Sequence, residues 1–130
     1  MMRRFLRDAR GSMGLEFGLA LPVLIALIIG VLQFGLILNA NGAMRHAMGE
    51  GLRLAKVNPT ATETAVLTRT RDTLIGVDHA GIQTLTFARG TTNNVGTGTM
   101  TMTIQMTPVI PFAPIPPIVL TQSKTVYLPS

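Results

Sequence analysis

The fold is decided by residues 10–38, which read RGSMGLEFGLALPVLIALIIGVLQFGLIL. From Phe17 to Leu38 this stretch has 22 positions and no charged residue. As a helix it would be about 33 Å long, enough to cross a hydrocarbon core of about 30 Å. Glu16 stands directly before the uncharged run, and a carboxylate inside a membrane-length segment usually has a function. The sequence therefore predicts one transmembrane helix with a functional acidic residue near its start.

The positive charge of the chain is concentrated ahead of this segment. Residues 1–11 contain four arginines and one aspartate, which supply +3 of the net charge of +5. Arginines beside a membrane helix favour the cytoplasmic side, so we expect the C-terminal part to be exported, to the periplasm in a Gram-negative cell. The remaining charge is spread thinly, which argues against a nucleic-acid partner.

Composition excludes several kinds of chemistry. The 130 residues include no cysteine, so disulfides, thiolate metal sites and thiol nucleophiles cannot form. The two histidines, His46 and His79, and the six acidic residues show no metal-ligand spacing, and the sequence has no phosphate-binding loop. We expect a protein that is not an enzyme and that uses no cofactor, no metal and no small-molecule substrate.

Three interpretations of the apolar segment are open: an uncleaved signal anchor, a secretory signal cleaved near residues 40–42, and a prepilin-type segment cut on the cytoplasmic side between Gly11 and Ser12. A secretory signal fits poorly, because its apolar region usually spans about 7–15 residues. Cleavage after Gly11 would explain Glu16. The new α-amino group of Ser12 is largely protonated at neutral pH, and Glu16 lies one helical turn away on the same face. Within a helix bundle the carboxylate could neutralise its own or a neighbouring subunit's amine.

Other positions in the segment indicate close helix packing, since small residues four apart let helices approach. Pro22 should kink or loosen its turn because it removes a helical hydrogen bond. The polar side chain of Gln33 is either a buried hydrogen-bonding group or lies near the outer interface. The candidate packing positions are Gly14, Gly18, Pro22, Ala26, Gly30 and Gln33.

An extension of the membrane helix and a second helix are expected after the span. Residues 43–56 carry an apolar stripe at helical spacing, which predicts that the membrane helix continues into an amphipathic one, with a possible loosening of the chain at Asn41-Gly42. The stripe consists of Met44, Ala47, Met48, Gly51, Leu52 and Ala55. Asn58-Pro59 then resembles the start of a second helix, which should run to about Ile75 and end at Gly76.

The remaining sequence predicts a small antiparallel sheet. Strands are expected over 82–88, 99–107 and 118–128, with residues 90–98 as a turn or loop. The middle strand alternates strictly, so Met100, Met102, Ile104 and Met106 should share the buried face. Between the last two strands, prolines recur at every third residue from Pro108 to Pro117. This segment is either a stiff connector packed on its own domain or a ridge that docks a partner.

Several of these motifs together resemble the TadE-like family of pseudopilins of tight-adherence pilus systems. The resemblance covers about residues 10–55. It rests on Arg10-Gly11 as the cleavage junction, Glu16-Phe17 at the fifth and sixth positions after it, Leu21-Pro22, Gln33-Phe34-Gly35, and the Glu-Gly-x-Arg-x-Ala element formed by Glu50, Gly51, Arg53 and Ala55. Gln33 departs from the family, which often has a glutamate there.

The resemblance implies a role in pilus biogenesis. It implies cleavage by an inner-membrane prepilin peptidase, assembly with other pilin or pseudopilin subunits and the pilus machinery, and residence in the bacterial inner membrane or in a pilus. The expected α+β organisation is a basic leader (1–11), a transmembrane helix (12–38), an amphipathic helix (39–57) and a small exported domain (58–130). The alternative is an unprocessed, membrane-anchored binding module that recognises a ligand through its exported domain.

Overall fold

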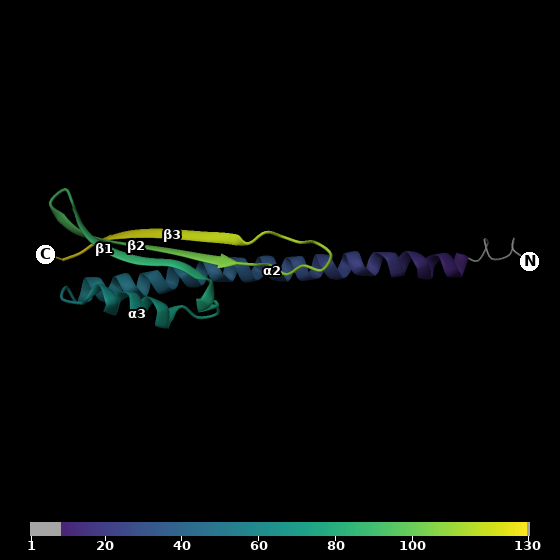
Figure 1. Cartoon of the computed structure of the whole chain (residues 1–130), viewed down its shortest axis with the longest axis horizontal. Coiled ribbons are helices and arrows are strands. Elements are labelled where there is room, and N and C mark those ends of the chain that lie inside the picture. Colours follow the sequence, from purple (N-terminus) through teal and green to yellow (C-terminus); the bar gives the residue numbers. More distant parts are fainter. Residues whose placement is uncertain (1–8, 130) are drawn as a thin grey trace, which may run out of the picture.

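The computed structural model describes residues 9–129, so most of the expected leader, residues 1–8, lies outside the described residues. The elements are helices α2 (Ala9–Val57) and α3 (Glu63–Thr73), the short 3-10 helix η1 (His79–Gly81), and strands β1 (Ile82–Thr92), β2 (Val95–Met106) and β3 (Ile118–Tyr127). The predicted α+β fold is confirmed. Figure 1 shows the sheet and α3 gathered on the C-terminal half of α2 and the loop between β2 and β3 reaching further along the helix, while the N-terminal end of the helix extends alone.

Helix α2 is a single helix of 49 residues, which corresponds to about 73 Å. It passes through Pro22 and through Asn41-Gly42 without interruption. The predicted continuation of the membrane helix into the amphipathic one is confirmed, and the possible loosening at Asn41-Gly42 is not seen. The side chain of Asn41 has a different use: its Oδ1 accepts a hydrogen bond of 2.6 Å from Nε2 of Gln122 on β3. This polar contact ties the helix to the sheet.

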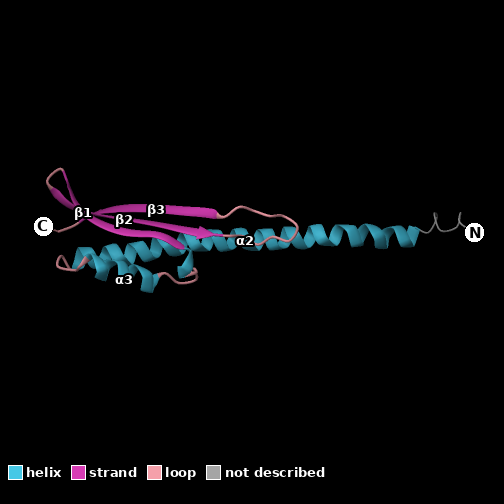
Figure 2. Ribbon diagram, in the orientation of Figure 1, coloured by secondary structure: helices cyan, strands magenta, loops and turns pink. Residues whose placement is uncertain are grey.

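The three strands form an antiparallel meander in the order β1-β2-β3, as predicted (Figure 2). The loop expected over 90–98 is mostly strand, because the hairpin closes through only Asn93 and Asn94. Both have positive φ, 52° and 62°. Two consecutive positive-φ residues match the twist of a tight hairpin, and asparagine tolerates this conformation better than other non-glycine residues.

The predicted start of the second helix is wrong. Asn58 forms a local turn in which its Oδ1 accepts hydrogen bonds from the backbone N–H and the hydroxyl of Thr60. Helix α3 begins at Glu63, after the Thr62 hydroxyl oxygen, which caps the helix by accepting from the Ala65 N–H at 3.2 Å. An asparagine followed by proline favours a turn as readily as a helix cap, and here the turn lets the chain reverse.

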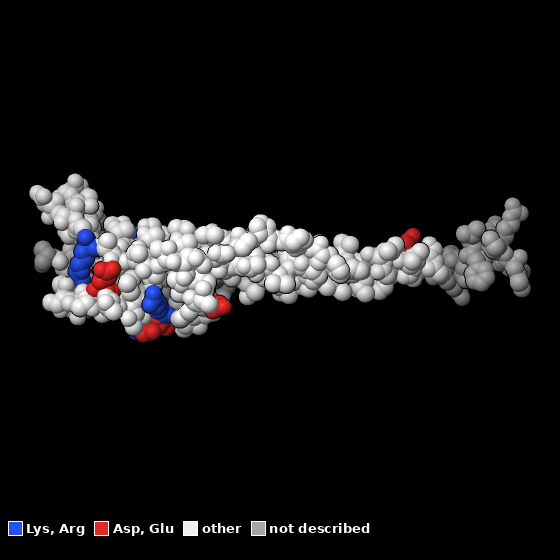
Figure 3. All heavy atoms as spheres, viewed as in Figure 1, with Lys and Arg blue, Asp and Glu red and all other residues white. Residues whose placement is uncertain are grey.

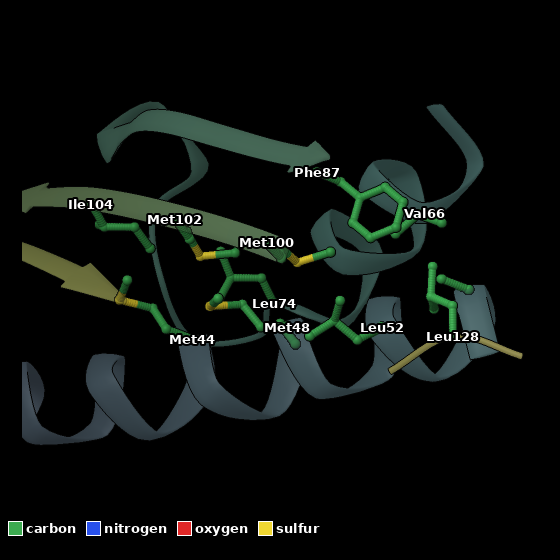
Figure 4. Close-up of a cluster of buried hydrophobic side chains, with 12 residues drawn as sticks. Met44, Met48, Leu52, Val66, Leu74, Phe87, Met100, Met102, Ile104 and Leu128 are labelled. Carbon is green, nitrogen blue, oxygen red and sulfur yellow. The ribbon is translucent and has the colours of Figure 1, made fainter. Parts of the chain in front are cut away.

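One hydrophobic core holds the domain together. It lies between a layer of two helices and the sheet: α2 packs beneath β2 and β3, while α3 packs beneath β1. The whole predicted stripe of α2 is buried, and on β2 the side chains of Met100, Met102 and Ile104 are fully buried opposite it (Figure 4). On the outer face of the sheet, hydroxyl pairs link β2 to β3, for example Thr99 to Thr125 at 2.9 Å.

Candidate functional site: the exposed apolar helix

The most unusual surface of the molecule is the N-terminal part of α2, residues 11–25, which we call the stalk. Every residue of the stalk is exposed. Large apolar side chains point outward all around it, with Met13, Leu19 and Val23 each about 70% exposed. A helix that is apolar on all sides is stable only when lipid or other helices cover it. Helix α2 is long and apolar enough to span a membrane, and none of its most apolar window is buried within the protein.

Glu16 is the single charged residue of the stalk. Figure 3 shows the helix as an uncharged white surface that is interrupted by acidic atoms near its N-terminal end. Glu16 is exposed, and the ion pairs found among residues 11–129 do not involve it. Ser12 lies four residues earlier in the same helix, so both residues occupy one face, while Phe17 is 66% exposed beside them. This end of the helix therefore presents an acidic group that has no ion-pair partner among residues 11–129.

The two pairs of small residues have different surroundings. A Cβ added at Gly14 or Gly18 would meet nothing within 4 Å, so this pair forms an open notch on the stalk. Ala26 and Gly30 are half-buried, and a Cβ on Gly30 would lie 3.7 Å from Cδ1 of Ile110. The chain's own loop therefore approaches the second pair, and only the first is open to another helix.

Gln33 lies on the face of α2 that the domain covers. Its half-buried side chain lines an open hollow of about 480 Å³ between the helix and the sheet, together with Asp78, Gln83 and Gln105. Pro108 closes the side nearest the connection from β2 to β3. The one strongly polar residue of the apolar run thus faces other polar groups of its own chain.

The Glu50, Gly51 and Arg53 element lies where α3 crosses α2. Oε2 of Glu50 is 3.3 Å from Nη2 of Arg69 on α3, and its Oε1 is 3.9 Å from Nη1 of Arg53. Gly51 is buried, and a Cβ there would overlap Oγ1 of Thr70. The element therefore fixes the crossing of two helices. The sequence did not predict that Arg69 and Thr70 contact this element. They lie about twenty residues further along the chain, and no local pattern indicates which turns of the two helices pack together.

Replacing Arg69 by alanine should lower the free energy of unfolding by at most about 1 kcal/mol, because exposed ion pairs contribute little. The Arg69 side chain is 52% exposed and that of Glu50 is 24% exposed. Arg71→Ala is the matched control, since Arg71 is an exposed arginine of the same helix. Chemical unfolding of the full chain in detergent should show a larger loss for Arg69, and the difference should shrink at high salt. Equal losses would contradict a stabilising pair.

Comparison with known proteins agrees with the N-terminal geometry. Residues 11–53 match the TadE-like protein family. The match begins at Gly11, includes the stalk and Gln33, and ends at Arg53 of the helix-crossing element. No curated protein and no solved structure matches the chain. The chain thus carries a TadE-like segment over residues 11–53, which confirms the family resemblance found in its sequence.

Proposed function

We propose that the protein is a pseudopilin, a minor pilin-like subunit, that acts in assembling a tight-adherence pilus. The observation that carries this proposal is the stalk. It is an apolar helix that is exposed on all sides and continuous with a folded domain, and the carboxylate near its start makes no ion pair within residues 11–129. Such a shape suits a subunit that first resides in a membrane and then joins a bundle of like helices. The TadE-like match over the same helix supports the same role.

In this proposal a prepilin peptidase cuts the chain between Gly11 and Ser12 at the cytoplasmic face of the inner membrane. The arginine-rich leader holds that end in the cytoplasm, and the α+β domain lies in the periplasm. Cleavage creates an amine on Ser12 one turn from Glu16. The carboxylate then pairs with an amine in the bundle, which compensates for the cost of burying either charge alone.

The open surface at Gly14 and Gly18 and the apolar side chains of the stalk would allow the helix to move from lipid into a bundle of pilin helices. Lipid tails are as apolar as leucine, so helix association in a membrane depends on close packing rather than on hydrophobic burial. Gly14 and Gly18 leave an open groove in which a neighbouring pilin or pseudopilin helix can approach the backbone. The protein acts in this scheme by packing and pairing, without catalysis.

The test is the N-terminal sequence and intact mass of the membrane-bound protein, from cells with and without the prepilin peptidase. We expect a start at Ser12 that depends on the peptidase. Gly11→Leu should abolish the cut because it changes the junction, whereas Gly14→Leu, the matched control inside the stalk, should leave it intact.

Two other results would overturn the processing step. A start at Met1 in every strain would leave an anchored domain and favour the alternative of a periplasmic or surface binding module. A start near Ala43 would mean a cleaved secretory signal. Either outcome would remove the Ser12 amine on which the pairing with Glu16 depends.

A further inference from the structure

The connection between β2 and β3, residues 107–117, is a second apolar surface that the proposed function does not use; we call it the tip loop. Its sequence is TPVIPFAPIPP, and the chain carries no charge from Gly90 to Ser123. Val109 is 70% exposed and Phe112 is 88% exposed. Most loops that connect strands are polar, because they face water. This loop instead presents bulky apolar side chains.

The end of the tip loop is a tight turn that points Phe112 outward. The backbone N–H of Ala113 donates to the carbonyl of Ile110 at 3.3 Å, with Pro111 and Phe112 as the central residues. Phe112 has a φ of 63°, in the left-handed region that favours glycine or asparagine at this position of a turn. A bulky residue held there is strained, and strain of this kind persists mainly where it serves a function.

The tip loop does not project away from the molecule but runs back along α2 towards its N-terminus (Figure 1). The half-buried side chain of Ile110 lies against Gly30 of the helix, with its Cδ1 3.7 Å from the position of a glycine Cβ. The level of the tip along the helix is therefore fixed at about residue 30.

This level can be compared with the span of a membrane. The uncharged part of α2, apart from Glu16, begins after Arg10 and ends before Arg45. If the hydrocarbon core begins at Gly11, it ends near residue 31, because Gly11 to Gly30 is about 28 Å of helix and the core is about 30 Å thick. If the span is placed further along the helix, up to Leu38, the tip lies about 12 Å inside the core. In each placement the tip is at the outer boundary of the hydrocarbon or within it.

We propose that the tip loop inserts into the outer face of the bilayer that α2 crosses, with Phe112 and Val109 in contact with lipid. The polar groups of the loop backbone limit how deeply the loop can enter the bilayer. Irregular backbone is not tolerated in the hydrocarbon core, because its N–H and C=O groups find no partner there. Five of the eleven residues in the loop are prolines, which have no N–H to satisfy. The tip therefore lies at the boundary of headgroups and acyl chains, and the hydrocarbon span is close to 11–30.

We infer that lipid covers the tip loop, because the loop packs against the same helix that crosses the membrane and its position along that helix is fixed. The surface of the tip is continuous with the exposed apolar face of α2 beside it, where Val31 and Leu27 are more than 60% exposed. A loop without charges, next to a membrane span, has no electrostatic means to select a protein partner, whereas it matches the apolar side of the interface. The inference requires only that α2 spans a membrane and is independent of processing at Gly11.

The experiment uses the absence of tryptophan from the chain. Full-length Phe112→Trp and Val95→Trp proteins are reconstituted separately in phosphatidylcholine vesicles. Val95 is exposed and starts β2 directly after the hairpin turn, at the end of the domain away from the N-terminus of α2. Tryptophan emission is recorded with iodide in the water, and with lipids brominated near the headgroup end of the acyl chains.

We expect Phe112→Trp to be strongly quenched by the brominated lipid and several-fold less accessible to iodide than Val95→Trp. Equal iodide quenching of the two variants would overturn the proposal. Protection of Phe112→Trp that disappears when the protein is diluted with excess lipid would also overturn it, because the tip would then be covered by a second copy. Both variants place an aromatic residue at an exposed site, so neither should disturb the core. Circular dichroism before the measurement verifies that both are folded.

Discussion

Replacing Glu16 by alanine is expected to leave the protein in the membrane and cut after Gly11, but to abolish its contribution to pilus assembly. Removal of one partner from a buried charge pair costs about 3–5 kcal/mol, because the other charge stays buried and unpaired. This loss corresponds to more than a hundredfold in an assembly equilibrium, at 1.4 kcal/mol for each factor of ten. Insertion should not suffer, since a charge in the membrane is itself unfavourable. The measurement is the amount of surface pili at equal levels of processed protein.

Two companion variants separate charge from packing. Glu16→Gln keeps the size of the side chain and should fail like alanine, because it cannot neutralise an amine. Leu19→Ala removes an apolar side chain that is 68% exposed, one turn further along the helix, and should reduce assembly much less. Normal pilus output from Glu16→Ala, or equal defects in Glu16→Ala and Leu19→Ala, would contradict the pairing role.

The predictable parts of the fold are those in which apolar residues repeat at the spacing of a helix or strand that has one buried face. The stripe from Met44 to Ala55 repeats at helical spacing, and the alternation from Met100 to Ile104 repeats at strand spacing. Both patterns record which side chains face the core, and both surfaces are buried against each other in the structure. The antiparallel order of β1 and β2 followed because a short connection allows few other topologies. Patterns of this kind are local, so one sequence is enough to recognise them.

The predictions failed where a short sequence motif is compatible with two local structures. Asn58-Pro59 is compatible with a helix cap and with a turn, and only the need to reverse direction before α3 selects the turn. Asn41-Gly42 resembles a weak point of a helix, yet tertiary contact with Gln122 uses the asparagine and the helix continues. Such choices depend on partners far away in the sequence, which no local pattern identifies.

The candidate site could be predicted only in part. The exposed apolar helix follows from the uncharged run of the sequence, whereas the roles of Gly11, Ser12 and Glu16 stay predictions from charge and spacing. The position of the tip loop against Gly30 could not be predicted, since prolines at every third residue indicate stiffness but give no direction. The role of Gly51 was also hidden, because a glycine in a helical stripe has the same appearance whether it is merely tolerated or required.

Gly51→Ala is expected to destabilise the domain by about 2 kcal/mol, although alanine is the better helix former. The added Cβ would overlap Oγ1 of Thr70 and lie 3.1 Å from the backbone carbonyl oxygen of Val66. Both atoms belong to α3, so relief requires a shift of that helix away from α2. The sulfur-bearing end of Met100 can adapt, but the carbonyl cannot. Chemical unfolding of the full chain in detergent, followed by circular dichroism, measures the loss.

Gly49→Ala provides the matched control on the same helix, two residues away. Its Cβ would approach only the flexible end of Lys124, at 4.0 Å, so the substitution should stabilise the protein by about 0.5–1 kcal/mol. Thr70→Ala removes the overlapping hydroxyl and should rescue part of the Gly51→Ala loss, giving a clearly non-additive double mutant. If both glycine substitutions stabilise, or if Thr70→Ala gives no rescue, then close approach of α3 is not what Gly51 provides. Opposite signs at the two glycines, with rescue at one, would show that the close crossing of α2 and α3 requires a glycine at position 51.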